Sequence, residues 1–150
     1  MDSKYEQDTR EGYNIEIQAL QLAMYQLYYN LTKDKEYKKQ ENELWQTVRE
    51  RFLKNHILQD NVQDQAIRPN VFLAAYIFPK LLHKDEWIQT FQHHLPRLWL
   101  EWGGLSTIDK THWLFTPLDT GENPKSYHRG DSWYWLNNLA ALVMYRLDKE

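Results

Sequence analysis

The sequence predicts an all-α domain of about five helices, stacked as α-hairpins into part of a toroid. Three observations lead to this prediction. Apolar residues recur at helical spacing in several segments, and no segment alternates apolar and polar residues as a half-buried strand does. Successive helices also alternate, one apolar on two sides and the next apolar on one side. The 150 residues suit a single domain, residues 1–150.

The first helix is predicted to be an inner one, because it is apolar on two sides and needs neighbours all round. Its two stripes are Leu20, Met24, Leu27 and Leu31, and Ile15, Ala19 and Leu22. Asp8 or Thr9 is the expected cap. The next segment, from about Lys35 to His56, has a single stripe and is predicted to be an outer helix, with charged residues on its other faces.

The order of an inner helix followed by an outer helix then repeats. Pro69 suits the start of an inner helix that continues from Val71 to Leu82 and is bent or interrupted by Pro79. An outer helix begins near Lys84 or Asp85 and ends before residues 103–104, and a long loop, 105–130, precedes a last inner helix over about 132–147. In a toroid the loops before the inner helices converge, so we expect segments 10–16, 67–70 and 127–135 to meet.

The bulk properties exclude several classes of protein. A net charge of −3 and a pI near 6.1 argue against a general nucleic-acid binder. No apolar run has membrane-spanning length, no signal peptide precedes the polar start, and cysteine is absent, so a cytoplasmic protein without membrane contact is expected. The histidines are scattered and no carboxylates cluster with them, which predicts neither a metal site nor a cofactor.

Aromatic residues make up 15% of the chain, and the densest segment is 127–135. It combines Tyr127, Trp133 and Trp135 with His128 and Asp131 around a glycine. An indole stacks on the apolar face of a pyranose, while charged and amide groups bind its hydroxyls. The segment therefore predicts a sugar-binding site, although core packing accounts for most of the other aromatic residues.

Five residues are candidates for chemistry or binding, and each has a plainer interpretation. They are Glu16, Arg68, Asp109, Glu122 and Asp131. Glu16 lies between two isoleucines on a buried helix and needs a partner, either Arg68 or a substrate hydroxyl. Asp131 or Ser132 is expected to cap the last helix, which is the favoured role for this pair, and Asp109 is suited to cap a turn. Glu122 lies in a polar loop, where it is either a surface carboxylate or a general base.

Four segments in the same order resemble the glycogen-debranching amylo-α-1,6-glucosidases. Residues 12–20 are similar to the family's Gly-x-x-Val-Glu-Ile-x-Ala-Leu, and residues 68–70 to its Arg-Pro-Asn. Residues 104–107 resemble its Gly-Leu-Arg-Thr turn, and residues 127–135 its Tyr-His-x-Gly-x-x-Trp-x-Trp. The matches extend over residues 10–147.

The resemblance implies an (α/α) barrel of six hairpins and inverting hydrolysis of the α-1,6-linked glucose at a glycogen branch stub. Two carboxyl groups roughly 6.5–9.5 Å apart perform such a reaction. Glu122 is the best candidate for the general base, with Asp119 or Asp131 as alternatives. The residues implied to bind the α-glucan are Glu16, Arg68, Asn70, His128, Asp131, Trp133 and Trp135.

The family's general acid lies in a Thr-Trp-Met-Asp-like segment before the first motif, and residues 1–11 contain no such segment. The expectation is therefore the C-terminal part of a debranching catalytic domain, which lacks the general acid and is inactive alone. Its open edge would be covered by self-association or by the missing N-terminal half. The alternative is a non-catalytic carbohydrate-binding or helical interaction module on the same scaffold.

Overall fold

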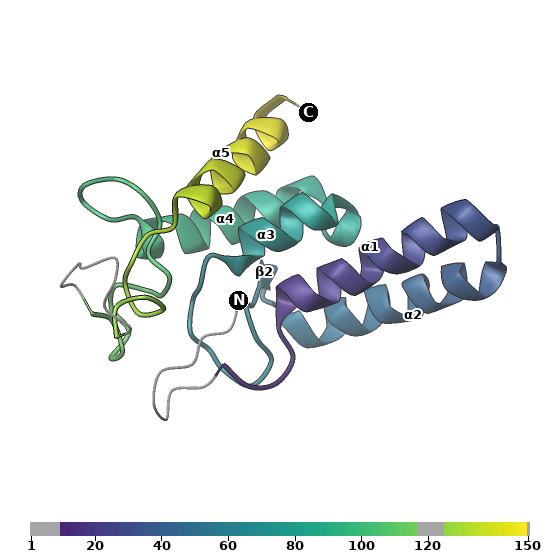
Figure 1. The fold of residues 1–150 in the computed structure, drawn as a ribbon, viewed down its shortest axis with the longest axis horizontal. Coiled ribbons are helices and arrows are strands. Elements are labelled where there is room, and N and C mark those ends of the chain that lie inside the picture. The colour runs from purple at the N-terminus through teal and green to yellow at the C-terminus, as the bar shows by residue number, and fades with distance from the viewer. Residues whose placement is uncertain (1–9, 117–124, 150) are drawn as a thin grey trace.

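The computed structural model describes residues 10–116 and 125–149, and it confirms an all-α fold (Figure 1). The helices are α1 (Ile15–Thr32), α2 (Lys35–Phe52), α3 (Asn70–Ile77), α4 (Lys84–Leu98) and α5 (Tyr134–Lys149), with a short 3-10 helix η1 (Pro79–Leu81). Within these ranges no helix combines the length and apolar character that spanning a bilayer requires.

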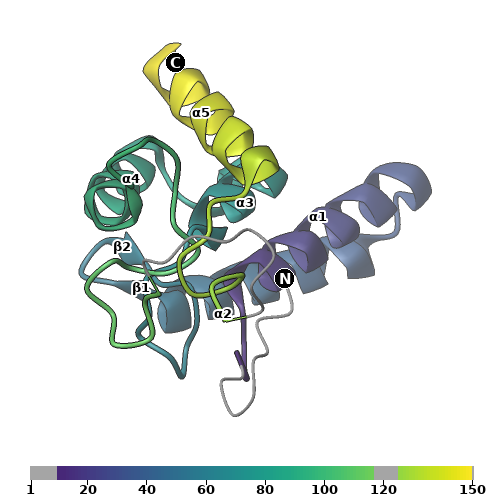
Figure 2. The same ribbon diagram turned by 60° about the vertical axis from the view of Figure 1, so that its left-hand side comes forward.

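Helices α1 and α2 form an antiparallel hairpin whose far end projects away from the other helices (Figures 1 and 2). Lys33 ends α1 in the left-handed region, at φ 59°, and Asp34 caps α2 by accepting a hydrogen bond from the Glu36 N–H at 2.9 Å. Helix α1 starts after Asn14, later than a cap at Asp8 or Thr9 requires.

Helix α2 ends at Phe52 and does not continue to His56, so this part of the prediction was wrong. Two strands of two residues each, β1 (Leu53–Lys54) and β2 (Ile57–Leu58), pair instead as a tight hairpin. Its turn residues Asn55 and His56 have φ values of 50° and 64°. Asparagine and histidine are among the side chains that tolerate this left-handed backbone, and the turn reverses the chain toward α3.

Helix α3 is the central helix, and it packs against both α1 and α5. Its sequence is almost wholly apolar, as predicted for an inner helix, and it ends at Ile77 because Pro79 cannot continue it. Helix α4 covers the core from one side through its buried face, where Phe72 of α3 stacks on Phe91 with ring centroids 4.6 Å apart. The core therefore lies around α3.

The second apolar stripe of α1 is uncovered, although an inner helix should be buried all round. Leu20, Met24, Leu27 and Leu31 are exposed, with Leu31 at 72%. Helix α5 likewise buries one face and leaves Tyr134 and other aromatic residues exposed. The hairpin stack is present, whereas its closure into a toroid stays a prediction.

Candidate functional site

The start of α1 is fixed by a loop that the sequence presents only as a polar link. Asn61 donates from Nδ2 to the side-chain oxygen of Asn14 at 2.6 Å and to the carbonyl of Glu11 at 2.8 Å. The Ile15 N–H donates to the carbonyl of Asp60 at 3.0 Å. Loop 60–64 therefore determines where α1 begins and how it lies against α3.

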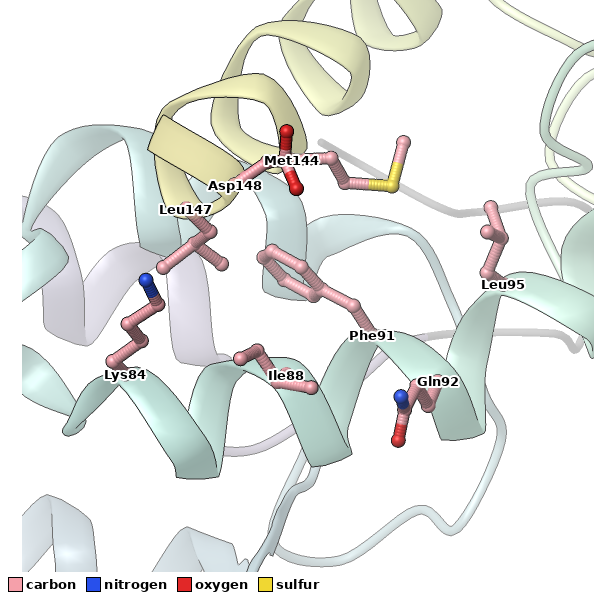
Figure 3. Close-up of a pocket in the computed structure, with 8 residues that line it drawn as sticks. All are labelled: Lys84, Ile88, Phe91, Gln92, Leu95, Met144, Leu147 and Asp148. Carbon is pink, nitrogen blue, oxygen red and sulfur yellow. The ribbon is translucent and has the colours of Figure 1, made fainter. Parts of the chain in front are cut away.

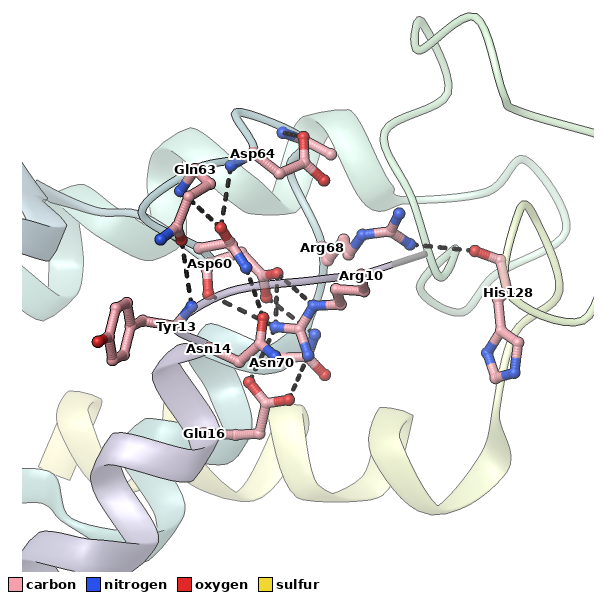
Figure 4. A network of polar contacts seen from close by, with 12 residues as sticks. Arg10, Tyr13, Asn14, Glu16, Asp60, Gln63, Asp64, Arg68, Asn70 and His128 are labelled. Atoms are coloured by element: carbon pink, nitrogen blue, oxygen red, sulfur yellow. Dashed lines mark hydrogen bonds and ion pairs between the residues drawn. The ribbon is translucent and has the colours of Figure 1, made fainter. Parts of the chain in front are cut away.

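Arg10 lies between two buried carboxylates, Glu16 and Asp60 (Figure 4). Its Nη1 and Nη2 donate to the two oxygens of Glu16, the second at 2.9 Å, and its Nη2 and Nε donate to Asp60 Oδ2 at 2.6 and 3.0 Å. Burial disfavours the charge on Arg10, but the two carboxylates outweigh it, so the pKa of Arg10 is raised. The partner that Glu16 requires is thus Arg10.

Asp60 joins this group to the first residue of α3. Asn70 donates from Nδ2 to Asp60 Oδ1 at 2.8 Å, and both side chains are buried. Burial raises the pKa of Asp60, and the Arg10 guanidinium opposes this rise. Arg10 and Asp60 are fifty residues apart along the chain. Their contact and the bond from Asn70 to Asp60 hold the starts of α1 and α3 in one network.

Arg68 extends the connection to the segment before α5. It is 3% exposed, and its Nη1 donates to the carbonyl oxygen of His128 at 3.2 Å (Figure 4). The two connections together link the starts of all three predicted inner helices. Glu16, Arg68, Asn70 and His128, taken from three separate motifs, consequently belong to one connected region.

Three aromatic rings follow one another in the segment before α5. Tyr127 lies edge-on to Trp133, with centroids 4.1 Å apart, and to His128 at 4.7 Å. The Trp133 indole donates to the carbonyl of Tyr127 at 3.2 Å, which holds the ring against its own loop. Trp133 is half-buried and Trp135, on the first turn of α5, is exposed. Exposed indole faces of this kind suit stacking on a sugar ring.

Asp109 makes the turn contact that its structural interpretation predicts, whereas the Asp131 carboxylate contacts a residue of its own loop. The Asp131 carboxylate accepts from the Ser126 hydroxyl at 3.1 Å. Asp109 accepts from the N–H of Thr111 at 2.8 Å, and its own N–H donates to the carbonyl of Ile67 at 2.9 Å. Asp109 thus ties the long loop to the segment before α3, and a helix-cap or binding role for Asp131 stays a prediction.

Glu122, the candidate base, and Asp119, its alternative, lie outside the described residues. In ranges 10–116 and 125–149, no three His, Asp or Glu side chains gather as a metal site would require. Sequence reasoning missed Arg10 and Asp60. Arg10 lies in a segment, 10–16, that was already expected at the site, whereas nothing in the loop sequence marks Asp60 as buried.

A separate groove of about 470 Å³ lies between α4 and the C-terminal half of α5 (Figure 3). It is lined mainly by apolar side chains, among them Phe91, Leu95 and Met144, with Lys84 and Asp148 as the charged residues. The residues of the network lie before or at the starts of the helices instead. The groove is therefore distinct from the candidate sugar site.

Comparison with known proteins identifies the family of the chain. The comparison with curated proteins finds no match. A protein-family model described as amylo-alpha-1,6-glucosidase matches residues 1–148, which is nearly the whole chain and includes all four motifs. On this match, the chain belongs to the amylo-alpha-1,6-glucosidase family, a family of glycogen-debranching glycoside hydrolases.

Proposed function

We propose that this chain supplies the glucosyl-binding half of an inverting amylo-α-1,6-glucosidase site, which takes the α-1,6-linked glucose at a glycogen branch stub. The observation that carries the proposal is the connected network at the starts of α1, α3 and α5. A glucosyl unit has hydroxyls around its rim and an apolar face, so it needs hydrogen-bonding groups and an aromatic platform together.

Glu16 and Asn70 are the proposed acceptors for sugar hydroxyls. A carboxylate has about four lone-pair sites, so Glu16 can accept hydrogen bonds from Arg10 and from a hydroxyl group together. Trp133 and Trp135 are the stacking surfaces, and His128 and Asp131 complete the proposed rim. Arg68 orders this rim through its contact with His128 and supplies a positive charge beside the sugar.

Glu122 is the proposed general base, which removes a proton from the water that attacks the anomeric carbon. The leaving oxygen takes a proton from a carboxylic acid on the other side of the sugar, and the water needs a gap of roughly 6.5–9.5 Å between the two groups. By family resemblance this acid belongs to a Thr-Trp-Met-Asp-like segment before residues 12–20, and residues 1–11 contain no such segment. We therefore propose that the isolated chain binds α-glucan but does not hydrolyse it.

The exposed stripe of α1 supports a proposal about assembly. No charged residue occurs between Ile17 and Thr32, and Leu20, Leu27 and Leu31 are among the exposed side chains. Such a surface is apolar enough to be an interaction face. We propose that the N-terminal half of the domain or a second copy of the chain covers it. Light scattering of the parent and of Leu27→Lys tests self-association, which the charge should abolish.

The experiment that tests the function is a titration with isomaltose and maltotriose, followed by tryptophan fluorescence, together with an assay of glucose release from phosphorylase limit dextrin. The proposal expects binding without release of glucose, and weaker binding in Trp133→Ala and in Glu16→Gln. Glucose release by the purified chain, or an unchanged affinity in both variants, contradicts the half-site.

A binding module is the second candidate, because several tryptophans are exposed, with Trp113 at 84%. Glu16→Gln separates the two candidates in the isolated chain, and Glu122→Gln separates them only when the rest of the catalytic domain is present. A module binds through its aromatic residues alone, so Trp133→Ala should abolish binding while Glu16→Gln and Glu122→Gln leave it intact. The half-site requires Glu16, and it requires Glu122 once the rest of the catalytic domain restores hydrolysis.

A further inference from the structure

The carboxylate of Asp60 is bound on both sides by donors. Its Oδ1 accepts from Asn70 Nδ2 at 2.8 Å, and its Oδ2 accepts from Arg10 Nε and Nη2 at 3.0 and 2.6 Å. The residue is 3% exposed. Asp60 is therefore enclosed by protein, and within residues 10–116 and 125–149 its carboxylate is bonded to Arg10 and Asn70, through which it can influence a ligand.

The contact with Asp60 fixes which end of the Asn70 amide is available. The nitrogen of Asn70 is used by the carboxylate, and its Oδ1 is buried without a hydrogen-bond partner among the described residues. A buried amide oxygen without a donor is costly and rare in folded proteins. A hydroxyl group, from water or from a sugar, supplies the missing donor.

We propose that Asp60 is a positioning residue that turns the oxygen of Asn70, rather than its nitrogen, toward a glucosyl hydroxyl. The inference rests on the proposed glucosyl site and adds to it the direction of one hydrogen bond. In this arrangement the sugar hydroxyl donates its proton to Asn70 Oδ1. Asp60 keeps the amide in this orientation because a carboxylate only accepts hydrogen bonds.

Asp60→Asn makes a sharp prediction, because the new amide must satisfy two neighbours of different kinds. A guanidinium has no acceptor, so the amide oxygen has to face Arg10 and the amide nitrogen has to face Asn70. Asn70 then has to present its oxygen to that nitrogen and its own nitrogen to the sugar. The substitution is nearly isosteric, and it should reverse the hydrogen-bonding character that Asn70 offers the ligand.

The test measures the affinity of isomaltose and of analogues in which each hydroxyl of the non-reducing glucosyl unit is replaced in turn by hydrogen or by fluorine. A fluorine accepts weakly and cannot donate. In the parent, one position should lose roughly tenfold in affinity with either replacement, equivalent to one hydrogen bond. In Asp60→Asn the preference for the hydroxyl over fluorine at that position should fall at least several-fold.

Asp64→Asn is the matched control. Asp64 lies on the same loop, and its Oδ1 accepts from the Ala66 N–H at 2.9 Å without touching Arg10 or Asn70. It should keep the parent's preference. A purely structural role for Asp60 predicts a uniform loss over all analogues, and that result overturns the inference.

A second measurement needs no variant at Asp60. The side-chain amide protons of Asn70, assigned by their absence in Asn70→Asp, should exchange with solvent far more slowly than those of an exposed asparagine such as Asn138. Rapid exchange overturns the inference even if Asp60→Asn does not fold. If the parent binds none of the analogues, the proposed function fails and this inference fails with it. If the parent binds them and Asp60→Asn keeps the same preference, only this inference fails.

Discussion

Arg68 Nη1 donates to the carbonyl oxygen of His128 at 3.2 Å, so a residue just before α3 holds the loop that leads into α5. Two residues later, Asn70 holds the loop that leads into α1 through Asp60. The Arg-Pro-Asn motif is thus connected to the segments before α5 and before α1. It lies between them in the candidate site.

Arg68→Lys should weaken the contact with the His128 carbonyl, because an ammonium group cannot reproduce the geometry of the flat guanidinium. Loss of a buried charged hydrogen bond should lower the free energy of unfolding by about 1–3 kcal/mol and weaken isomaltose binding about tenfold. Urea denaturation and fluorescence titration measure both. Arg97→Lys is the control, since the Arg97 side chain is 43% exposed and should change little. Equal effects of the two substitutions would refute the role of Arg68.

The ion pair between Arg49 of α2 and Glu86 of α4 should make stability depend on acidity. Its two contacts measure 2.6 and 2.8 Å, and the hydrogen bonds from Arg49 hold the pKa of Glu86 at about 2, below its ordinary 4.5, although burial works in the other direction. The stabilisation is therefore complete above pH 4.5 and lost as the pH falls toward 2.

Glu86→Gln should remove this pH dependence and lower the free energy of unfolding by about 1–2 kcal/mol at neutral pH. The loss is limited to this size because the pair is partly exposed to solvent. Denaturation between pH 2 and 7 measures the effect. Glu43→Gln is the matched control, since Glu43 is exposed and lies 4.0 Å from Lys39. If Glu86→Gln still loses stability steeply as the pH falls below 4.5, groups other than Glu86 cause the pH dependence.

His94 should destabilise the fold in mild acid. It is 1% exposed, and its Nδ1 donates to the carbonyl of Thr90 at 2.8 Å. Burial lowers its pKa from 6.5 to about 4, so the unfolded chain takes up a proton first as the pH falls through this range. Stability should decline between pH 6.5 and 4 by about 2–3 kcal/mol.

His94→Gln should flatten this decline, as measured by thermal denaturation at a series of pH values. His56→Asn is the control, because His56 is an exposed turn residue with φ 64°, a conformation that asparagine adopts readily. If both substitutions give the same profile as the parent, another group carries the dependence.

Gly130→Ala should disturb the loop before α5. An added Cβ would lie 2.3 Å from the carbonyl oxygen of Thr116, which cannot move independently of the backbone. We expect a lower melting temperature and loss of saccharide binding. Gly103→Ala is the comparison, because no atom lies within 4 Å of its added Cβ and only its left-handed backbone, φ 93°, is strained, at about 1 kcal/mol. Tolerance of Gly130→Ala would mean that this loop repacks freely.

The helices could be predicted because their apolar spacing is a local property. The error at His56 was local as well: Lys54-Asn55-His56 contains no glycine or proline, so the turn had no strong signal, and a helix-like charge pattern preceded it. The exposed stripe of α1 could not be foreseen, since sequence periodicity shows that a face is apolar and not whether a neighbour covers it.

The site was predictable to the level of its motifs. Glu16, Arg68 and Asn70 have distinctive neighbours in the sequence. The structure connects Glu16 to Asn70 through Arg10 and Asp60, and Arg68, two residues before Asn70, bonds to His128. Asp60 could not be identified in this way, because an aspartate in a polar loop is solvated in most proteins. Only the closure of loop 60–64 over Arg10 removes it from water, and this closure is a tertiary event.

The bond between Arg10 and Asp60 also bears on how the chain folds. It closes a loop of fifty residues, and the entropy of closing so long a loop is repaid only after α1, α2 and α3 have come together. We therefore expect the charges to lock the helix starts late, after the transition state. Weakening them should speed unfolding and leave the refolding rate nearly unchanged.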